Sequence, residues 1–312
     1  MDEKQRGIVI KSTGSRYKVR LLSGEILDCT LKGRYRNRKI KTTNPVTVGD
    51  EVSVQSKASG EHIIAEIADR RNYLVRKSSK LSKQYHLVAA NVDQIMLVTT
   101  IVKPKMVLGF IDRVMVSAEA YGIPVILVIN KFDLLGEKHL SKLAETVSIY
   151  EEIGYACIVT STVTGEGMEE VKSALTKKRT VITGQSGVGK STLINTLQPG
   201  LDIKTAEVSL SNDKGRHTTT FAEMHALDFG GEIIDTPGVR SFGIADFKRE
   251  HLGHYFPEMR DLMGACKFNN CVHVNEPGCA VKAALEAGDI APQRYFNYLE
   301  MYENENVEKA YK

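Results

Sequence analysis

The chain has 312 residues, of which 42% are hydrophobic and 26% are charged. These values are typical of folded globular proteins and exclude collagen-like and largely disordered chains, and the length allows two or three domains. No apolar run approaches the roughly 18 residues that a membrane helix needs. Residues 1–6 begin with acids and lack the apolar segment of a signal peptide. We therefore expect a cytoplasmic protein without a membrane partner.

Positive charge is concentrated near the N-terminus. Residues 1–80 contain 18 Lys and Arg against 9 Asp and Glu, a net charge of +9, whereas the whole chain carries +4 and the remainder therefore −5. The densest basic stretch is 32–41, and it includes Tyr35, whose ring either stacks on a base or is buried in the barrel. This distribution favours RNA or DNA as the partner of the first domain. A solvated loop that only keeps the protein soluble is the alternative.

The N-terminal region is rich in short β-like segments separated by turns. The expected strands are 7–11, 16–22, 26–30, 46–54 and 62–67. About five short strands in such a length predict a small barrel, an OB-fold, with an SH3-like barrel as the rival. We place this domain at 1–70 and interpret 70–82 as a polar connector.

Apolar strands alternate with amphipathic helices from residue 92 onwards. The expected strands are 92–98, 124–129, 155–160 and 180–183, and the expected helices are 107–121, 137–153, 167–176 and 191–197. The alternation predicts a parallel sheet with helices on both faces, in a central α/β domain at 71–243. It stops after Ile233-Ile234. We expect 244–312 to form a mainly α-helical domain whose last helix begins near Pro292.

A phosphate-binding loop is the clearest motif. The segment Gly184-Gln185-Ser186-Gly187-Val188-Gly189-Lys190-Ser191 matches G-x-x-x-x-G-K-[ST] between an apolar strand and a helix. In such a loop backbone N–H groups surround the β-phosphate, Lys190 bridges the β- and γ-phosphates, and Ser191 ligates Mg²⁺. Thr192 falls in the first helical turn, near the α-phosphate. A glycine-rich turn without a ligand is the alternative, and eight matching positions disfavour it.

A second motif, Asn130-Lys131-Phe132-Asp133, ends another apolar strand. Asp133 can accept hydrogen bonds from guanine N1–H and the exocyclic amine, a pair of donors that adenine lacks. Lys131 can lay its alkyl stem over the base, and Asn130 can tie this loop to the P-loop. Thr160-Ser161-Thr162, after the next strand, would offer a backbone N–H to guanine O6. Alone the second motif also fits a surface turn, but beside a P-loop it predicts GTP and GDP as ligands.

A third motif, Asp235-Thr236-Pro237-Gly238, follows the last apolar strand. We expect Asp235 to hold Mg²⁺ through water and the Gly238 N–H to meet the γ-phosphate. Upstream, Thr219 and Thr220 are both candidates for a further Mg²⁺ ligand, and the sequence does not choose between them.

A cluster of three cysteines and one histidine lies near the C-terminus. A reducing cytosol disfavours disulfides, so metal binding is the better interpretation. Three thiolates and one imidazole suit one closed, structural, tetrahedral Zn²⁺ per chain. Unrelated thiols and a surface histidine are the alternative. The candidate ligands are Cys266, Cys271, His273 and Cys279.

These motifs are those of a GTPase in a permuted order, because the base-reading motif precedes the P-loop and the Asp-Thr-Pro-Gly motif comes last. With a basic barrel before them and a Cys/His cluster after them, the chain resembles the circularly permuted, small-ribosomal-subunit-dependent GTPases of the RsgA type, also called YjeQ or YloQ. The resemblance covers essentially the whole chain. It implies an OB-fold, a permuted GTPase domain and a zinc domain, binding to the small ribosomal subunit and its rRNA, and hydrolysis stimulated by that subunit during its late maturation.

The catalytic machinery departs from the common pattern at Val239, where many GTPases have a glutamine that orients the attacking water. A valine cannot form that hydrogen bond, so we expect slow intrinsic hydrolysis. The family resemblance suggests that His217 takes the place of the glutamine, so the catalytic candidates are His217 and Lys190. A solvent-exposed loop histidine without a catalytic role is the alternative for His217.

We predict a monomeric GTP hydrolase that acts as an assembly checkpoint on the small subunit. One rival is an RNA-binding module that keeps GTP only as a structural ligand, which Val239 permits. The other is a P-loop kinase, which the guanine motif disfavours.

Overall fold

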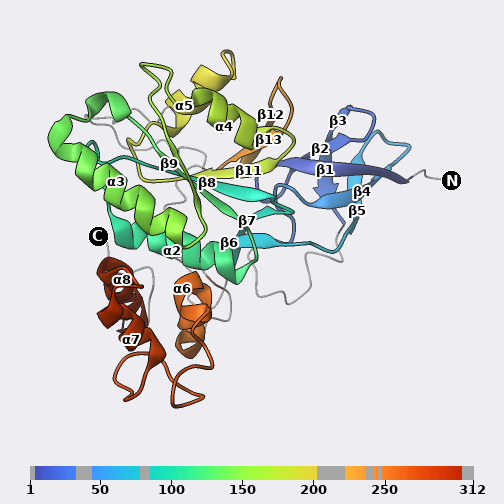
Figure 1. Ribbon diagram of the computed structural model, residues 1–312. Coiled ribbons are helices and arrows are strands. Elements are labelled where there is room, and N and C mark those ends of the chain that lie inside the picture. Colours follow the sequence, from blue (N-terminus) through green and yellow to red (C-terminus); the bar gives the residue numbers. More distant parts are fainter. Residues whose placement is uncertain are drawn as a thin grey trace, which may run out of the picture.

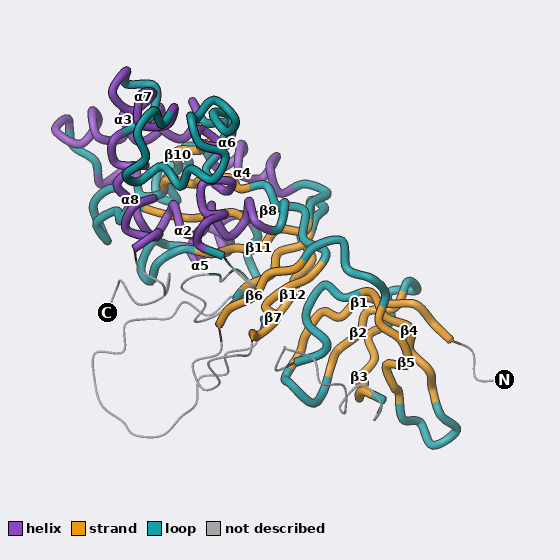
Figure 2. Tube along the Cα trace, turned by 90° about the horizontal axis from the view of Figure 1, so that it is seen from below, coloured by secondary structure: helices purple, strands orange, loops and turns teal. Residues whose placement is uncertain are grey.

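The computed structural model describes residues 4–32, 44–77, 85–201, 222–236, 242, 244 and 248–303. A β-barrel lies at one end of the molecule, an α/β layer structure follows, and the C-terminal helices pack beside the α/β part (Figures 1 and 2). Within the described ranges, no helix is long and apolar enough to cross a membrane.

The N-terminal strands form a closed barrel. Their order is β1-β2-β3-β5-β4, and pairing of β1 with β4 closes the ring. Alternate residues point inward, so that Val9, Val19 and Ile64 share one core. The predicted five-stranded barrel is confirmed, although the strand expected at 46–54 begins only at Glu51. The strands are β1 (Lys4–Ser12), β2 (Tyr17–Leu21), β3 (Ile26–Leu31), β4 (Glu51–Ser56) and β5 (His62–Ile67).

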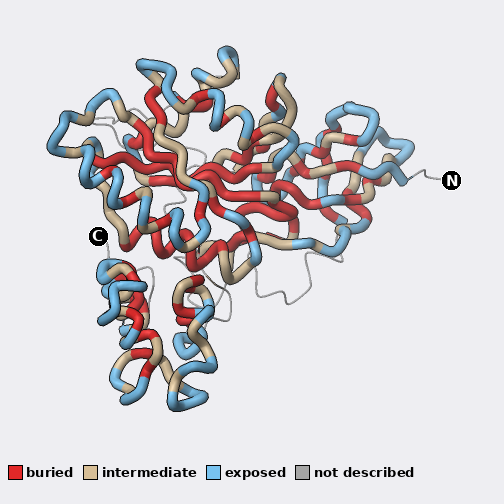
Figure 3. Tube along the Cα trace, in the orientation of Figure 1, coloured by how far each residue is buried: buried red, intermediate tan, exposed pale blue. Residues whose placement is uncertain are grey.

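The central domain is a sheet of order β10-β9-β8-β11-β13-β12, in which all neighbours are parallel except β12 and β13. Figure 3 shows the buried residues concentrated along the central strands. Successive side chains along these strands point to opposite faces of the sheet, and both faces are buried. Leu97 packs in the core with α2 and α3, while its neighbour Val98 packs in the core with α4 and α5. The strands are β8 (Gln94–Thr99), β9 (Val125–Ile129), β10 (Ala156–Val159), β11 (Arg179–Thr183), β12 (Glu223–Ala226) and β13 (Glu232–Asp235). The helices are α2 (Leu108–Ala120), α3 (Glu137–Glu152), α4 (Met168–Leu175) and α5 (Lys190–Leu197).

The barrel continues the central sheet. Strand β1 pairs antiparallel with β12, which makes one sheet of 11 strands. Lys11 on β1 forms an ion pair with Glu223 on β12, with 2.6 Å between Nζ and Oε2. Glu232 on β13 accepts from Arg20 of the barrel and, at 2.9 Å, from Arg179 of β11. Ion pairs therefore join the barrel to the edge of the sheet.

The segment expected to be a polar connector contains a strand. Strand β6 (Tyr73–Lys77) pairs antiparallel with β7 (Tyr85–Ala90) in a separate two-stranded sheet. The prediction of a connector was therefore wrong for 73–77, where the apolar run is short and surrounded by basic residues, while 78–82 lie outside the described residues. Leu74 is nevertheless fully buried and belongs to the core that also covers α2.

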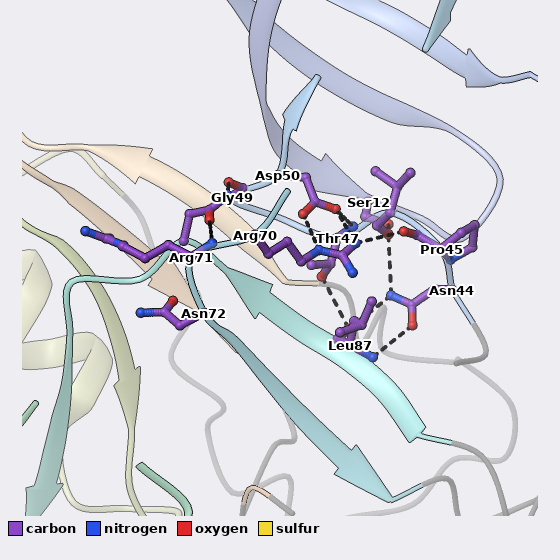
Figure 4. Close-up of polar contacts among 12 residues, drawn as sticks. Ser12, Asn44, Pro45, Thr47, Gly49, Asp50, Arg70, Arg71, Asn72 and Leu87 are labelled. Carbon is purple, nitrogen blue, oxygen red and sulfur yellow. Dashed lines mark hydrogen bonds and ion pairs between the residues drawn. The ribbon is translucent and has the colours of Figure 1, made fainter. Parts of the chain in front are cut away.

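A buried ion pair fixes the junction between the barrel and this two-stranded sheet (Figure 4). The side chain of Asp50 is fully buried, and Arg70 donates to both of its carboxylate oxygens, at 2.6 and 2.8 Å. Arg70 also donates to the Pro45 carbonyl at 2.8 Å, and the Thr47 N–H donates to Asp50 at 2.9 Å. These bonds satisfy a carboxylate that water does not reach.

The C-terminal helices are anchored to α2 by a second buried network. Arg294 on α8 donates to Asp112 on α2 at 2.6 Å and to Glu258 on α6 at 2.7 Å, and all three side chains are nearly inaccessible. The Tyr150 hydroxyl on α3 donates to Asp112 at 2.8 Å. This region comprises η2 (Arg249–Tyr255), α6 (Pro257–Arg260), α7 (Ala280–Ala287) and α8 (Pro292–Glu303).

Replacing Arg70 by alanine should lower the free energy of unfolding by about 3 kcal/mol, because it leaves Asp50 buried without its counter-charge. Lys4→Ala is the matched control in the same barrel, since the Lys4–Glu66 pair is half exposed on both sides and should contribute under about 1 kcal/mol. Chemical denaturation of both variants measures the difference. Equal losses would contradict the importance of the buried pair.

Candidate nucleotide site and metal centre

The P-loop connects the end of β11 to the start of α5, at the edge where the parallel strands end. Lys190 is the first residue of α5, and its ammonium donates to the carbonyls of Gly184 and Gln185, at 2.7 Å each. Burial lowers the pKa of Lys190, and the carboxylate of Asp235 opposes this shift. A cation is thus held over the loop, where an anionic ligand would complete its coordination.

Asn130 links three loops at this edge. Its side chain is almost fully buried, and its Nδ2 donates to the Val188 carbonyl of the P-loop at 2.9 Å. Its Oδ1 accepts from the Thr160 hydroxyl at 3.1 Å, in the loop after β10. The tie between the base motif and the P-loop that the sequence suggested is therefore present in the structure.

Lys131 bridges two further segments. Its backbone adopts a left-handed conformation, with φ of 65°, and its ammonium donates to the carbonyl of Gly187 at 2.6 Å. The same nitrogen donates to the carbonyl of Lys103 at 2.8 Å. Sequence analysis missed Lys103, because no sequence motif marks a backbone carbonyl in a turn.

Asp133 is in contact with the loop that follows β10. The Ser161 hydroxyl donates to Asp133 Oδ1 at 2.6 Å and accepts the N–H groups of Val163 and Thr164, at 3.2 Å each. The backbone N–H of Thr160 donates to the Ile129 carbonyl at 2.9 Å. Ser161 likewise donates its N–H to the carbonyl of Glu166, at 3.0 Å.

Asp235 ends β13 and lies beside Ile182 of β11, so the third motif reaches the same edge. Burial raises the pKa of Asp235, while His225 and Lys190 lower it. The Thr236 hydroxyl donates to the Ile182 carbonyl at 3.2 Å, which holds the start of the following loop against β11. The predicted positions that lie outside the described residues are Tyr35, His217, Thr219, Thr220, Pro237, Gly238 and Val239.

The four predicted metal ligands converge. Their ligand atoms all lie within 4.8 Å of one another. His273 Nδ1 is 3.7 Å from the sulfur of Cys266, 3.5 Å from that of Cys271 and 3.4 Å from that of Cys279. Burial raises the pKa of the Cys271 thiol to about 12, so its thiolate needs a cation nearby to form at neutral pH. The cluster is consistent with a metal site.

The backbone around the metal cluster is held from two sides. The Tyr295 hydroxyl on α8 donates to the His273 carbonyl at 2.7 Å. The Glu276 carboxylate accepts the N–H groups of Val272 and Val274, at 2.8 and 2.9 Å. Burial would raise the pKa of Glu276, but these donors outweigh it and the pKa is lowered. The ligand loop is therefore preorganised by its own contacts and by α8.

A P-loop, the Asn-Lys-Phe-Asp loop and an Asp-Thr motif lie at one sheet edge and follow one another in permuted chain order, which defines the class of circularly permuted P-loop GTPases. The chain matches the RsgA GTPase family over residues 67–245 and the RsgA N-terminal domain over residues 6–64. It belongs to the RsgA GTPase family, as the order of the motifs predicted.

Relatives of this chain match it almost end to end. It is 48% identical over 304 residues to the small ribosomal subunit biogenesis GTPase RsgA of Bacteroides fragilis, covering 97% of this chain and 98% of the relative. The protein of the same name from Flavobacterium psychrophilum is 48% identical over 303 residues, with 96% and 93% covered.

Two solved structures have the same fold over nearly the whole chain. YjeQ from Thermotoga maritima has a TM-score of 0.78 at 37% identity, with 96% of this chain and 98% of that chain covered. YloQ, a circularly permuted GTPase, has a TM-score of 0.73 at 32% identity, with 96% and 94% covered.

Gly189→Ala should weaken GDP binding at least tenfold, or about 1.4 kcal/mol. A Cβ at Gly189 would lie 2.6 Å from Asn130 Nδ2, so the Asn130 amide must shift, and we expect its bond to the Val188 carbonyl to weaken. Gly200→Ala is the control, because its φ of 94° matches the 93° of Gly189 but its Cβ would meet open space. Both variants should lose stability from the left-handed backbone, and only Gly189→Ala should lose GDP affinity. Equal GDP affinities in the two variants would show that nucleotide binding does not depend on the bond between Asn130 and the P-loop.

Proposed function

We propose that the chain is a GTP hydrolase that binds the small ribosomal subunit, acts in its late maturation and is stimulated by that subunit. The observation that carries this proposal is the full-length similarity to small ribosomal subunit biogenesis GTPases, together with the three nucleotide motifs at one sheet edge. We assign 1–70 to RNA binding, 71–243 to the GTPase and 244–312 to zinc binding. The site of action that this partner implies is the cytoplasm, and we propose that the protein acts there as a monomer.

Guanine would be read by Asp133, whose carboxylate already receives the Ser161 hydroxyl and has a second oxygen for the base. Because Thr160 and Ser161 donate their N–H groups within the protein, the donor to guanine O6 falls to Thr162. The proposed GTP-binding residues are Asn130, Lys131, Phe132, Asp133, Thr160, Ser161, Thr162, Gly184, Gln185, Ser186, Gly187, Val188, Gly189, Lys190, Ser191, Thr192 and Gly238.

Magnesium would bind with the triphosphate, held by Ser191, by Asp235 through water and by Thr219 or Thr220. Lys190 would neutralise charge that develops on the β- and γ-phosphates, which is the larger part of phosphoryl-transfer catalysis. Val239 cannot orient water, so His217 is the proposed catalytic replacement.

The metal of the Cys/His cluster would be Zn²⁺. A tetrahedron with Zn–S near 2.3 Å and Zn–N near 2.0 Å has N···S edges of about 3.5 Å. The edges from His273 to the three sulfurs, at 3.4 to 3.7 Å, are consistent with this geometry. Four protein ligands leave no position for water, so the role is structural.

Affinity for the subunit should depend on the nucleotide. A γ-phosphate contact at Gly238 would order the loop that leads to the zinc region, and a ligand shifts an equilibrium only by its differential affinity for the two states. Small-subunit affinity is measured with GDP and with a non-hydrolysable GTP analogue. The wild type should bind more tightly with the analogue, and Gly238→Ala should lose that difference. Equal wild-type affinities would exclude the checkpoint.

Metal analysis should find one Zn²⁺ per chain, and Cys271→Ala should lose it. Zinc in such sites contributes on the order of 10 kcal/mol to local folding, so the C-terminal region of the variant should become sensitive to protease. GDP binding should remain. Cys157→Ala is the control, because this thiol lies outside the cluster. A folded, metal-free wild type would contradict the assignment.

Asp133→Asn should bind GDP at least tenfold more weakly, since an amide N–H would oppose a guanine donor. Xanthine has a carbonyl where guanine has its amine, so XDP affinity should rise. Calorimetric titration with both nucleotides gives the ratio. An unchanged preference for GDP would show that Asp133 does not read the base.

A further inference from the structure

Thr100 stands immediately after β8, outside every motif of the nucleotide site. We propose that it is a positioning residue for nucleotide binding, which acts by holding the main-chain acceptor that fixes Lys131. This inference rests on the proposed nucleotide site. In this proposal the turn between β8 and α2 supports the nucleotide site together with the P-loop and the 130–133 loop.

The turn is closed by the hydroxyl of Thr100. This side chain is 1% exposed, and its Oγ1 donates to the Pro104 carbonyl at 2.6 Å. A bridge between Val102 and Lys105 closes the turn on its other side. The hydroxyl therefore links the first residue of the turn to Pro104, the residue that follows Lys103.

One of those carbonyl groups belongs to Lys103, and it accepts from the ammonium of Lys131 at 2.8 Å. The other acceptor of that ammonium is Gly187 of the P-loop, at 2.6 Å. The turn also lies against the P-loop, since a Cβ on Gly187 would be 3.9 Å from Cδ of Pro104. Two of the three donors of Lys131 are thus held by segments 84 residues apart in the chain.

Fixing both bonds of Lys131 has a consequence for affinity. A lysine side chain loses much rotamer freedom when it is ordered against a ligand. A side chain that is already held in place avoids that loss at the moment of binding. Within the described part of the chain, the side-chain donor to the Pro104 carbonyl is the Thr100 hydroxyl. Without it we expect the turn to relax, so that Lys131 keeps only its bond to Gly187.

Thr100→Val removes the hydroxyl and keeps the shape, whereas Thr100→Ser keeps the hydroxyl. Calorimetry with GDP should show about tenfold weaker binding for the valine variant and a change below about twofold for serine, a tenfold change being about 1.4 kcal/mol. Thr100→Ala, which cannot clash in the buried position, should reproduce the loss. Wild-type affinity in the valine and alanine variants would overturn the inference.

The decisive control is a double-mutant cycle with Lys131→Ala. If Thr100 acts through Lys131, Thr100→Val should have no further effect on GDP affinity in the Lys131→Ala background. The same tenfold loss in that background would show a general structural effect and overturn the positioning role. Wild-type affinity in Lys131→Ala alone would instead refute the proposed base site, and the inference with it.

A second readout separates positioning from base reading. IDP lacks the exocyclic amine that Asp133 is proposed to accept, while its ring offers Lys131 the same face. Thr100→Val should therefore weaken GDP and IDP by the same factor, with the ratio of their affinities unchanged. A changed ratio would mean that the turn acts on Asp133, which contradicts the route through Lys131.

Discussion

The parallel arrangement of the central strands is the constraint on which the site depends. Because β8, β9, β10, β11 and β13 all run the same way, their carboxyl ends meet at one edge whatever the order of the segments along the chain. A permuted order of the segments in the chain therefore still brings the 130–133 loop, the P-loop and Asp235 together. Asn130 fixes the relative positions of these loops, since its amide donates to the P-loop and accepts from the loop after β10.

The same sheet ties the nucleotide site to the flanking regions. Strand β12 lies between β13 and barrel strand β1, so the barrel is two strand positions away from the strand that ends in Asp235. On the other side, Arg294 and Asp112 hold α8 on α2, the helix that follows the Thr100 turn. The barrel and the region of the Cys/His cluster are thus attached to elements that also support the candidate nucleotide site.

Motifs and strands could be predicted because both have local signatures. The period of apolar residues places the central strands, and the positions of Asn130 and Lys190 follow from motif spacing. Contacts between distant segments have no such signature. The burial of Leu74 in a hairpin, the Arg294–Asp112 pair and the Lys103 carbonyl all depend on how remote segments pack, so the sequence could not show them.

Hydrolysis of GTP titrated with purified small ribosomal subunits tests the central claim most directly. The intrinsic rate should be low, because Val239 cannot orient water, and multiple-turnover phosphate release should rise with subunit concentration and saturate. Lys190→Ala should remove the stimulated rate. A rate that stays constant across the titration, with the subunits shown to bind, would contradict a subunit-stimulated GTPase and favour a nucleotide with a purely structural role.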